Sequence, residues 1–198
     1  EKRKGYKPRF QYVLAQLYQM NGEREAARNA YQKVLKMQPS NEMDFNARLR
    51  LAQLEKSPKE GIKLLTKMVK LDKNKDQLDQ IYGTIGDIYL AQTDTAMALI
   101  NYEKAIEEST QSGMAKAKVL ITAGDIYYEQ RNYIKASPCY KEATQILSAD
   151  NDQYERIQQR SETLDELVIE YSMVQLQDSL QHLATLSEAE QRVVVDSI

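Results

Sequence analysis

His182 and Cys139 are the single histidine and the single cysteine of this 198-residue chain, so any chemistry based on either rests on these two side chains. A Cys–His pair or a Ser–His–Asp set can support nucleophilic catalysis, in which the histidine removes the proton of the nucleophile. His182, however, lies in a stretch rich in Gln and Leu, and no nucleophile elbow or Gly-rich loop accompanies it. The sequence therefore predicts a surface or groove histidine, no catalytic residues and no enzymatic activity.

An acidic segment beginning at Asp72 is the strongest metal-binding candidate. Asp72, Asn74 and Asp76 match the start of a calcium-binding EF-hand loop. The sixth position, however, is Gln77 where the turn needs glycine, and the twelfth is Gly83 where glutamate should bind the ion. We therefore expect a polar loop between helices. Because the chain also has no Gly-rich phosphate loop and no Cys/His cluster with zinc spacing, we predict neither a metal site nor a cofactor.

Composition is typical of a folded helical protein. Hydrophobic residues make up 42% and charged residues 28%, while only seven Gly and four Pro interrupt the good helix formers. The net charge of −2 gives no electrostatic drive toward nucleic acid, and no apolar run approaches the ~20 residues that span a membrane. A basic N-terminal stretch is either an electrostatic contact arm or a solvated terminus; its residues are Lys2, Arg3, Lys4, Lys7 and Arg9.

A repeating pattern places most of the aromatic residues. An apolar residue precedes a small one, Tyr follows three residues later, and a second small residue precedes a second Tyr by four. This pattern resembles the 34-residue tetratricopeptide consensus, which predicts an all-α, right-handed superhelix of antiparallel helix pairs. The three instances are Leu14–Ala15–Tyr18–Ala27–Tyr31, Ile85–Gly86–Tyr89–Ala98–Tyr102 and Ala123–Gly124–Tyr127–Ala136–Tyr140.

The small residues are predicted to sit where paired helices cross closely. Gly86 would then face Ala98, Gly124 would face Ala136 and Ala15 would face Ala27, because a large side chain would separate the helices. The tyrosines would fill the space between successive hairpins and keep their hydroxyls hydrogen-bonded at the margin.

Spacing defines the domain organisation. The distance from Ala15 to Gly86 leaves room for one more unit, whose second helix would run from Pro58 to Leu71 with Ser57 as its N-cap and Gly61 at the close approach. A short extension is expected at Ser109–Gly113. The prediction is four hairpins, at about 8–41, 42–73, 78–112 and 116–150, and a C-terminal extension over 151–198 with a long helix from about 153 to 184. We interpret the chain as a fragment of a longer protein.

Function is expected on the concave face, which the first helix of each unit lines in such arrays. This surface mixes polar and aromatic side chains, as a site for a peptide or helix of a partner would, although mere exposure explains it equally well. The predicted partner-binding residues are Arg9, Tyr12, Gln16, Gln19, Asp87, Lys118, Ile121, Asp125, Tyr128 and Glu129.

Four segments go beyond the generic repeat: Arg9–Tyr18, Glu42–Arg48, Lys73–Tyr82 and Leu176–Arg192. In this order they resemble the PorW/SprE family of tetratricopeptide lipoproteins of the type IX secretion and gliding-motility system. The resemblance implies a non-enzymatic accessory protein that links components of the secretion machinery at the periplasmic side of the outer membrane. The family's lipid-bearing cysteine is absent here, since Cys139 lies inside a predicted repeat helix. Alternatives are a generic peptide-binding adaptor, a glycan-binding outer-membrane protein built on similar hairpins, or an enzyme whose catalytic domain lies outside the fragment.

Overall fold

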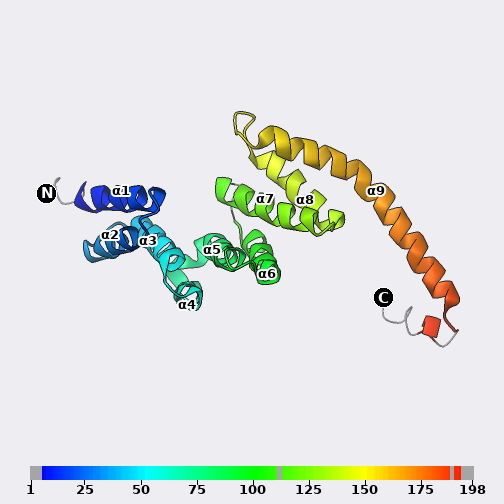
Figure 1. Cartoon of the computed structure of the whole chain (residues 1–198), viewed down its shortest axis with the longest axis horizontal. Coiled ribbons are helices and arrows are strands. Elements are labelled where there is room, and N and C mark those ends of the chain that lie inside the picture. Colours follow the sequence, from blue (N-terminus) through cyan, green and yellow to red (C-terminus); the bar gives the residue numbers. More distant parts are fainter. Residues whose placement is uncertain (1–5, 111–112, 188–189, 193–198) are drawn as a thin grey trace. The chain divides into compact units, whose positions relative to one another are not determined.

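The computed structural model describes residues 6–110, 113–187 and 190–192 (Figure 1). No strand occurs in these ranges, and the predicted all-α class is confirmed. Basic residues 2–4, part of the extension at 109–113 and the end of the chain beyond 192 lie outside the described residues. The elements are α1 (Tyr6–Met20), α2 (Arg24–Lys36), α3 (Asn41–Leu54), α4 (Pro58–Val69), the 3₁₀ helix η1 (Asp72–Gln77), α5 (Leu78–Leu90), α6 (Thr95–Glu107), α7 (Met114–Glu129), α8 (Tyr133–Ile146) and α9 (Tyr154–Thr185).

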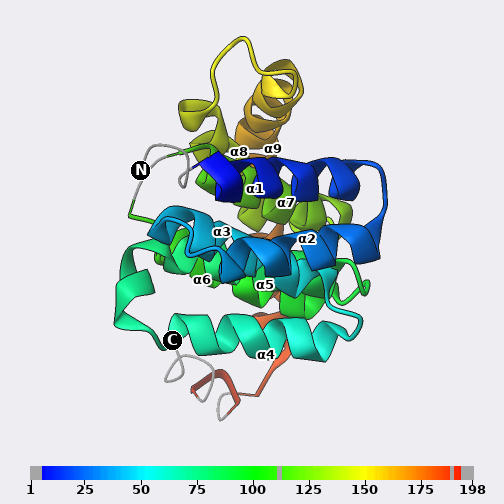
Figure 2. The ribbon, with the colours of Figure 1, turned by 90° about the vertical axis from the view of Figure 1, so that its left-hand side faces the viewer.

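The chain divides into two compact units, Glu1–Val119 and Leu120–Ile198, which meet inside α7. In the first unit each helix from α1 to α6 packs against the next one in sequence, and α1, α2 and α4 run across the view in Figure 2. In the second unit α9 packs along α8 and buries Ile157 and Leu164. This packing places α9 in the same compact unit as α8. The division into four hairpins and a C-terminal extension over 151–198 stays a prediction.

Three buried tyrosines form the centres of the hairpins. Tyr31, Tyr102 and Tyr140 are each 0% exposed. A Cβ added at Gly86 would lie 2.5 Å from the Tyr102 ring, and one added at Gly124 would lie 3.0 Å from the Tyr140 ring. These glycines therefore meet tyrosine rings of their own hairpin. The prediction that Gly86 and Gly124 are close-approach positions is confirmed. The group that approaches each one most closely, however, is the tyrosine ring of its own hairpin and not the expected alanine.

The second hairpin, α3–α4, lacks this tyrosine, and its two helices approach each other more closely. A Cβ at Gly61 would overlap the carbonyl oxygen of Ala52, so this position requires glycine for the close approach. Ser57 precedes the helix, but its side chain makes no cap hydrogen bond. The reason is that the backbone carbonyl of Ser57 already accepts from the amides of Glu60 and Gly61, at 3.0 and 3.2 Å.

The predicted polar loop after α4 is instead the 3₁₀ helix η1. Asn74 is 3% exposed, and its Nδ2 donates to the carbonyl of Met68 at 2.8 Å. Asn74 thereby adds a hydrogen bond to a carbonyl at the end of α4 that also accepts from the Leu71 amide at 3.2 Å, which explains why this residue is buried rather than directed toward an ion. Lys75 and Asp72 form an exposed ion pair across the turn, at 2.9 Å.

Candidate functional site

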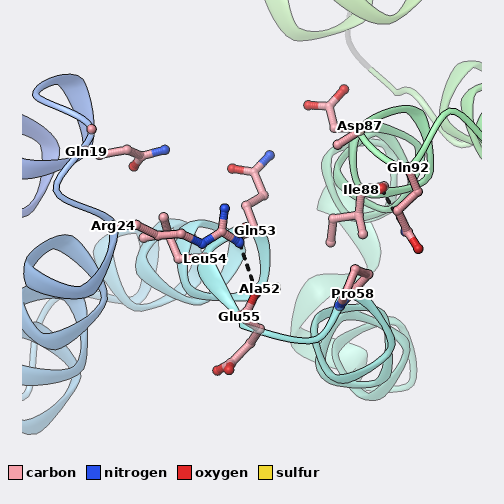
Figure 3. Close-up of a pocket in the computed structure, with 12 residues that line it drawn as sticks. Gln19, Arg24, Ala52, Gln53, Leu54, Glu55, Pro58, Asp87, Ile88 and Gln92 are labelled. Carbon is pink, nitrogen blue, oxygen red and sulfur yellow. Dashed lines mark hydrogen bonds between the residues drawn. The ribbon is translucent and has the colours of Figure 1, made fainter.

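A groove of about 600 Å³ lies in the first unit, where the C-terminal ends of α1, α3 and α5 come together. Figure 3 shows Gln19 of α1 on one side of it and Asp87 of α5 on the other, with Gln53 of α3 between them. Pro58 at the start of α4 also lines the groove. Its volume falls within the range of ligand-binding clefts. The lining residues are Gln19, Gly22, Arg24, Ala52, Gln53, Leu54, Glu55, Pro58, Asp87, Ile88, Ala91 and Gln92.

Arginines of α2 fix one wall of this groove. Nη2 of Arg24 donates to the backbone carbonyls of Gln53 and Glu55, at 2.9 Å each, and so satisfies carbonyls that the end of α3 leaves open. One turn along α2, Nη2 of Arg28 pairs with the Glu55 carboxylate at 3.1 Å. The wall is therefore held by charges that are already paired, while the Gln53 side chain stays at the groove surface.

The opposite wall is built around the Asp87 carboxylate. It accepts hydrogen bonds from the Tyr102 hydroxyl and from Nζ of Lys118, both at 2.9 Å. On α1, the Gln19 side-chain carbonyl accepts from the Tyr31 hydroxyl at 3.1 Å. A carboxylate, amide side chains and the negative ends of helix dipoles thus line the groove, and Arg24 lies on its α2 side. A partner segment that brings Lys, Arg or amide donors suits this arrangement best.

The hydroxyls of the buried tyrosines stay protonated, and so remain hydrogen-bond donors, over the whole physiological pH range. Burial raises the pKa of Tyr31 to about 12. Burial, together with the neighbouring carboxylate, also raises the pKa of Tyr102 and of Tyr140 well above the ordinary value. A neutral hydroxyl can donate to Gln19, Asp87 or Asp125, whereas a phenolate could not. The acceptors of the groove are therefore oriented by a buried group that does not titrate near neutrality.

In the first unit, the predicted site residues differ in what they do. Gln19 and Asp87 line the groove, and Lys118 is bound to Asp87. Tyr12 packs edge-to-face on Tyr31 with ring centroids 5.4 Å apart, which makes it part of the hairpin core. Two further predicted residues, Arg9 and Gln16, are exposed on α1 outside the groove lining.

In the second unit, two of the predicted residues make contacts within the chain. Ile121 is only 8% exposed, so it packs in the core instead of offering a contact surface. Asp125 accepts from the Tyr140 hydroxyl at 2.6 Å and from the guanidinium groups of Arg156 and Arg160. Its carboxylate serves to join α7, α8 and α9, because α9 supplies both arginines.

Tyr128 and Glu129 are the predicted residues of this unit that reach the surface. The Arg160 guanidinium lies over the Tyr128 ring, 4.6 Å from its centroid, and Tyr133 contacts the same ring edge-to-face at 5.6 Å. Tyr128 is therefore part of a packed aromatic and cationic cluster. Glu129, at the end of α7, is exposed.

The sequence prediction missed Gln53 at the centre of the groove, as well as Ala91 and Gln92. The first helix of the second repeat, α3, lacks the small–Tyr pattern, so the sequence analysis predicts no groove residue there. A signal was nevertheless present: Gln53 lies 34 residues after Gln19 and 34 residues before Asp87, which is one consensus repeat in each direction.

Comparisons with known proteins agree with this architecture. A sequence model described as "Tetratricopeptide repeat-like domain" matches residues 1–121. The chain belongs to this family. A second model, of the single tetratricopeptide repeat, matches residues 117–146. Among curated proteins, none matches the chain.

Two solved structures show the same fold. A crystal structure of MamA is 22% identical, with a TM-score of 0.51, over 77% of this chain and 83% of that chain. The crystal structure of BtubC (BKLC) from P. vanneervenii is 16% identical, with a TM-score of 0.62, over 86% of this chain and 76% of that chain. At this identity the likeness describes the fold alone.

Tetratricopeptide domains are generally non-catalytic scaffolds that mediate protein–protein interactions, and this is the function that the family assigns to the chain. Within the described ranges, no three His, Cys, Asp or Glu side chains cluster so as to hold a metal ion. Nor does any helix of that part of the chain have the length and apolarity to cross a bilayer.

Proposed function

We propose that the groove at the ends of α1, α3 and α5 holds a donor-rich segment of a protein partner. The observation that carries this proposal is the Asp87 carboxylate at the edge of one hollow, with the Gln19 and Gln53 amides beside it. Such a surface binds Lys, Arg or amide side chains by hydrogen bonds. The bound segment would lie across three repeats, which fits the way helical arrays present extended concave surfaces.

Ala91 offers a clean test, because it lies in the groove lining at the C-cap of α5 and is exposed. Ala91→Arg should fill the groove and add a positive charge, so partner binding should fall about tenfold or more. Ala96→Arg makes the same change at an exposed position of α6 outside the lining and serves as the control. Proteins that co-purify with the tagged full-length protein would be quantified for both variants. Equal recovery with Ala91→Arg and wild type would refute the groove as the binding site.

For the parent protein we propose a role as an accessory component of type IX protein secretion and gliding motility. It would link machinery components on the periplasmic side of the outer membrane. Support comes from the sequence resemblance of four segments, among them Lys73–Tyr82 and Leu176–Arg192, and from the scaffold function of the repeats.

Deletion of the gene should abolish the secretion of type IX cargo and gliding, and complementation with the wild-type gene should restore both. Cell fractionation should place the protein with the outer membrane. Normal cargo secretion in the deletion strain would exclude this role, while leaving the groove proposal to be judged by the Ala91→Arg result.

A further inference from the structure

The outward face of α4 carries a stripe of lysines. Residues three or four apart share one side of a helix, and at 100° per residue the four lysines at 59, 63, 67 and 70 fall within a sector of about 80°. Lys56 lies in the bend that precedes the helix. All five lysines are exposed, and the opposite side of α4 is the buried one, formed by Gly61, Leu65 and Met68. The stripe consists of Lys56, Lys59, Lys63, Lys67 and Lys70.

This stripe differs from the outer faces of later helices in having almost no acidic residue. Over positions 56–70 the five lysines are accompanied by the single carboxylate of Glu60, although the whole chain has a net charge of −2. On α6, by contrast, Lys104 stands between Glu103 and Glu107, and on α8 Lys141 pairs with Asp165 at 3.0 Å. Like charges one turn apart weaken a helix, so a lysine stripe is an unfavourable choice for a purely structural surface.

Most of these ammonium groups have no carboxylate at ion-pair distance in the part of the chain that the structure describes. Lys56 pairs with Glu25 at 3.2 Å, with both groups well exposed. No ion pair forms at Lys59, Lys63, Lys67 or Lys70 among the described residues. Four adjacent charges therefore remain available to an anionic partner.

An apolar hollow of about 510 Å³ borders the stripe at Lys67. Phe45, Met68 and Leu51 contribute to its apolar surface, and Leu64 and Leu71 are 40% and 46% exposed. Two carboxylates also line the hollow. Asp44 is held by Arg48 at 2.9 Å and lies 3.7 Å from Lys73, and Glu55 pairs with Arg28 at 3.1 Å.

The Asp44 carboxylate does not oppose an incoming anion strongly. The hydrogen bond from Arg48 is the main cause that holds the pKa of Asp44 below its ordinary value, so Asp44 stays ionised and paired. The rim nearest α4 is set by Lys67. On its other side Lys67 borders a second hollow, of about 450 Å³, which Lys63, Lys70 and Tyr89 also line.

We propose that the outer face of α4 binds an acidic segment of a protein partner that carries apolar side chains beside its carboxylates. The carboxylates would pair with Lys63, Lys67 and Lys70, while an apolar side chain enters the hollow beside Leu64 and Leu71. A protein segment fits better than a membrane surface. The apolar groups here line a hollow, whereas interfacial binding to lipid requires apolar side chains that project into the bilayer. This surface lies outside the groove of α1, α3 and α5 and does not depend on the function proposed for it.

The test uses a short fluorescent peptide of alternating Glu and Leu pairs, with anisotropy as the readout of binding to the purified chain. Binding should weaken as salt is added, because exposed charge pairs are screened. Lys63→Gln/Lys67→Gln should weaken it about tenfold or more. The matched control Lys7→Gln/Lys104→Gln, which removes the same charge at exposed positions of α1 and α6, should leave it unchanged. Failure of the wild-type chain to bind, or equal binding by the two double variants, would overturn the proposal.

Two further measurements separate the components of the site. Leu71→Ser should weaken binding of the Glu/Leu peptide while leaving its salt dependence intact, and a Glu/Ser peptide should bind more weakly than the Glu/Leu peptide. Equal affinity for the two peptides would show that the apolar hollow plays no part. Anionic phospholipid vesicles should fail to displace the peptide; if they displaced it, the partner would be a membrane instead. Ala91→Arg should not affect this peptide, which distinguishes the α4 surface from the groove.

Discussion

In hairpin α5–α6 the Tyr102 hydroxyl donates to Asp87, and in hairpin α7–α8 the Tyr140 hydroxyl donates to Asp125. Both carboxylates directly follow the glycine against which the tyrosine ring packs. Their remaining partners differ. Asp87 pairs with Lys118, whose side chain is 68% exposed, whereas Asp125 is held by Arg156 and Arg160 of α9.

The difference shows that the same repeat position can be held by different cations. A flexible, solvated ammonium group leaves Asp87 at the wall of an open groove. Arg156 approaches Asp125 with both terminal nitrogens, and planar guanidinium groups of this kind fix a carboxylate geometrically. We conclude that the acidic side chain itself does not mark a partner site, because the cations supplied by the next helix decide how firmly it is held: the two side chains are similarly exposed, at 28% for Asp87 and 34% for Asp125.

The largest difference between the two hairpins should come from their glycines. In Gly86→Ala the new Cβ would lie 2.5 Å from the Tyr102 ring, and such overpacking costs about 1–3 kcal/mol. In Gly124→Ala the contact with Tyr140 is 3.0 Å, so the overpacking is milder. Both variants gain about 1 kcal/mol in helix propensity, which should largely offset the cost in Gly124→Ala but not in Gly86→Ala. Chemical denaturation of both variants measures the change. Equal destabilisation would show that the two hairpins do not differ in closeness.

Neutralising the carboxylates should give the next largest difference. Asp125→Asn leaves two arginines and one hydroxyl with a single carbonyl acceptor, so we expect a loss of about 1–2 kcal/mol. Asp87→Asn retains an acceptor for Tyr102 and removes one exposed pair, which costs less than about 1 kcal/mol. Both values would come from urea denaturation at low salt. A larger loss for Asp87→Asn would contradict the proposed division between groove and architecture.

A pairwise test would sharpen this second comparison. In a double-mutant cycle, the unfolding free energies of the two single variants and the double variant give the coupling free energy of a pair. This coupling free energy should be larger for Asp125–Arg160 than for Asp87–Lys118, by a few tenths to about 1 kcal/mol. High salt should reduce the Asp87–Lys118 coupling more, since Lys118 is the more exposed cation. If salt affected both couplings equally, the arginines of α9 would be no better shielded than Lys118.

Much of the fold could be predicted from the sequence because repeat spacing encodes it. The small–Tyr pattern located three hairpins, and Gly61 was correctly assigned as a close approach. The contact made by each glycine could not be predicted, since periodicity places residues on a helix face without specifying which side chain they meet. The ion pairs of Asp125 could not be predicted for a related reason: its arginine partners lie on a helix that begins 29 residues later. The spacing was informative, because Lys118 and Arg156 each follow their aspartate by 31 residues.

The last comparison concerns pH, and here the two hairpins should behave alike. The pKa of a tyrosine is ordinarily 10.0, and burial raises the pKa of Tyr31 to about 12 and those of Tyr102 and Tyr140 as well. Below pH 10 these hydroxyls are protonated in both the folded and the unfolded chain, so their contribution to stability is fully present. Above pH 10 the unfolded chain ionises while the folded chain does not, and stability falls as the pH rises toward 12 and beyond.

Tyr102→Phe and Tyr140→Phe should each remove about 1 kcal/mol of the stability lost between pH 9 and pH 11, with little difference between them. Tyr6→Phe is the control, because Tyr6 is 57% exposed and should leave the loss unchanged. Denaturation curves at several pH values, with wild type alongside, provide the measurement. Arg160 and Asp125 act on the pKa of Tyr140 in opposite directions, so a clearly smaller effect of Tyr140→Phe would show that the guanidinium stabilises a phenolate there. In that case the two hairpins would differ in their electrostatics as well as in the closeness of their packing.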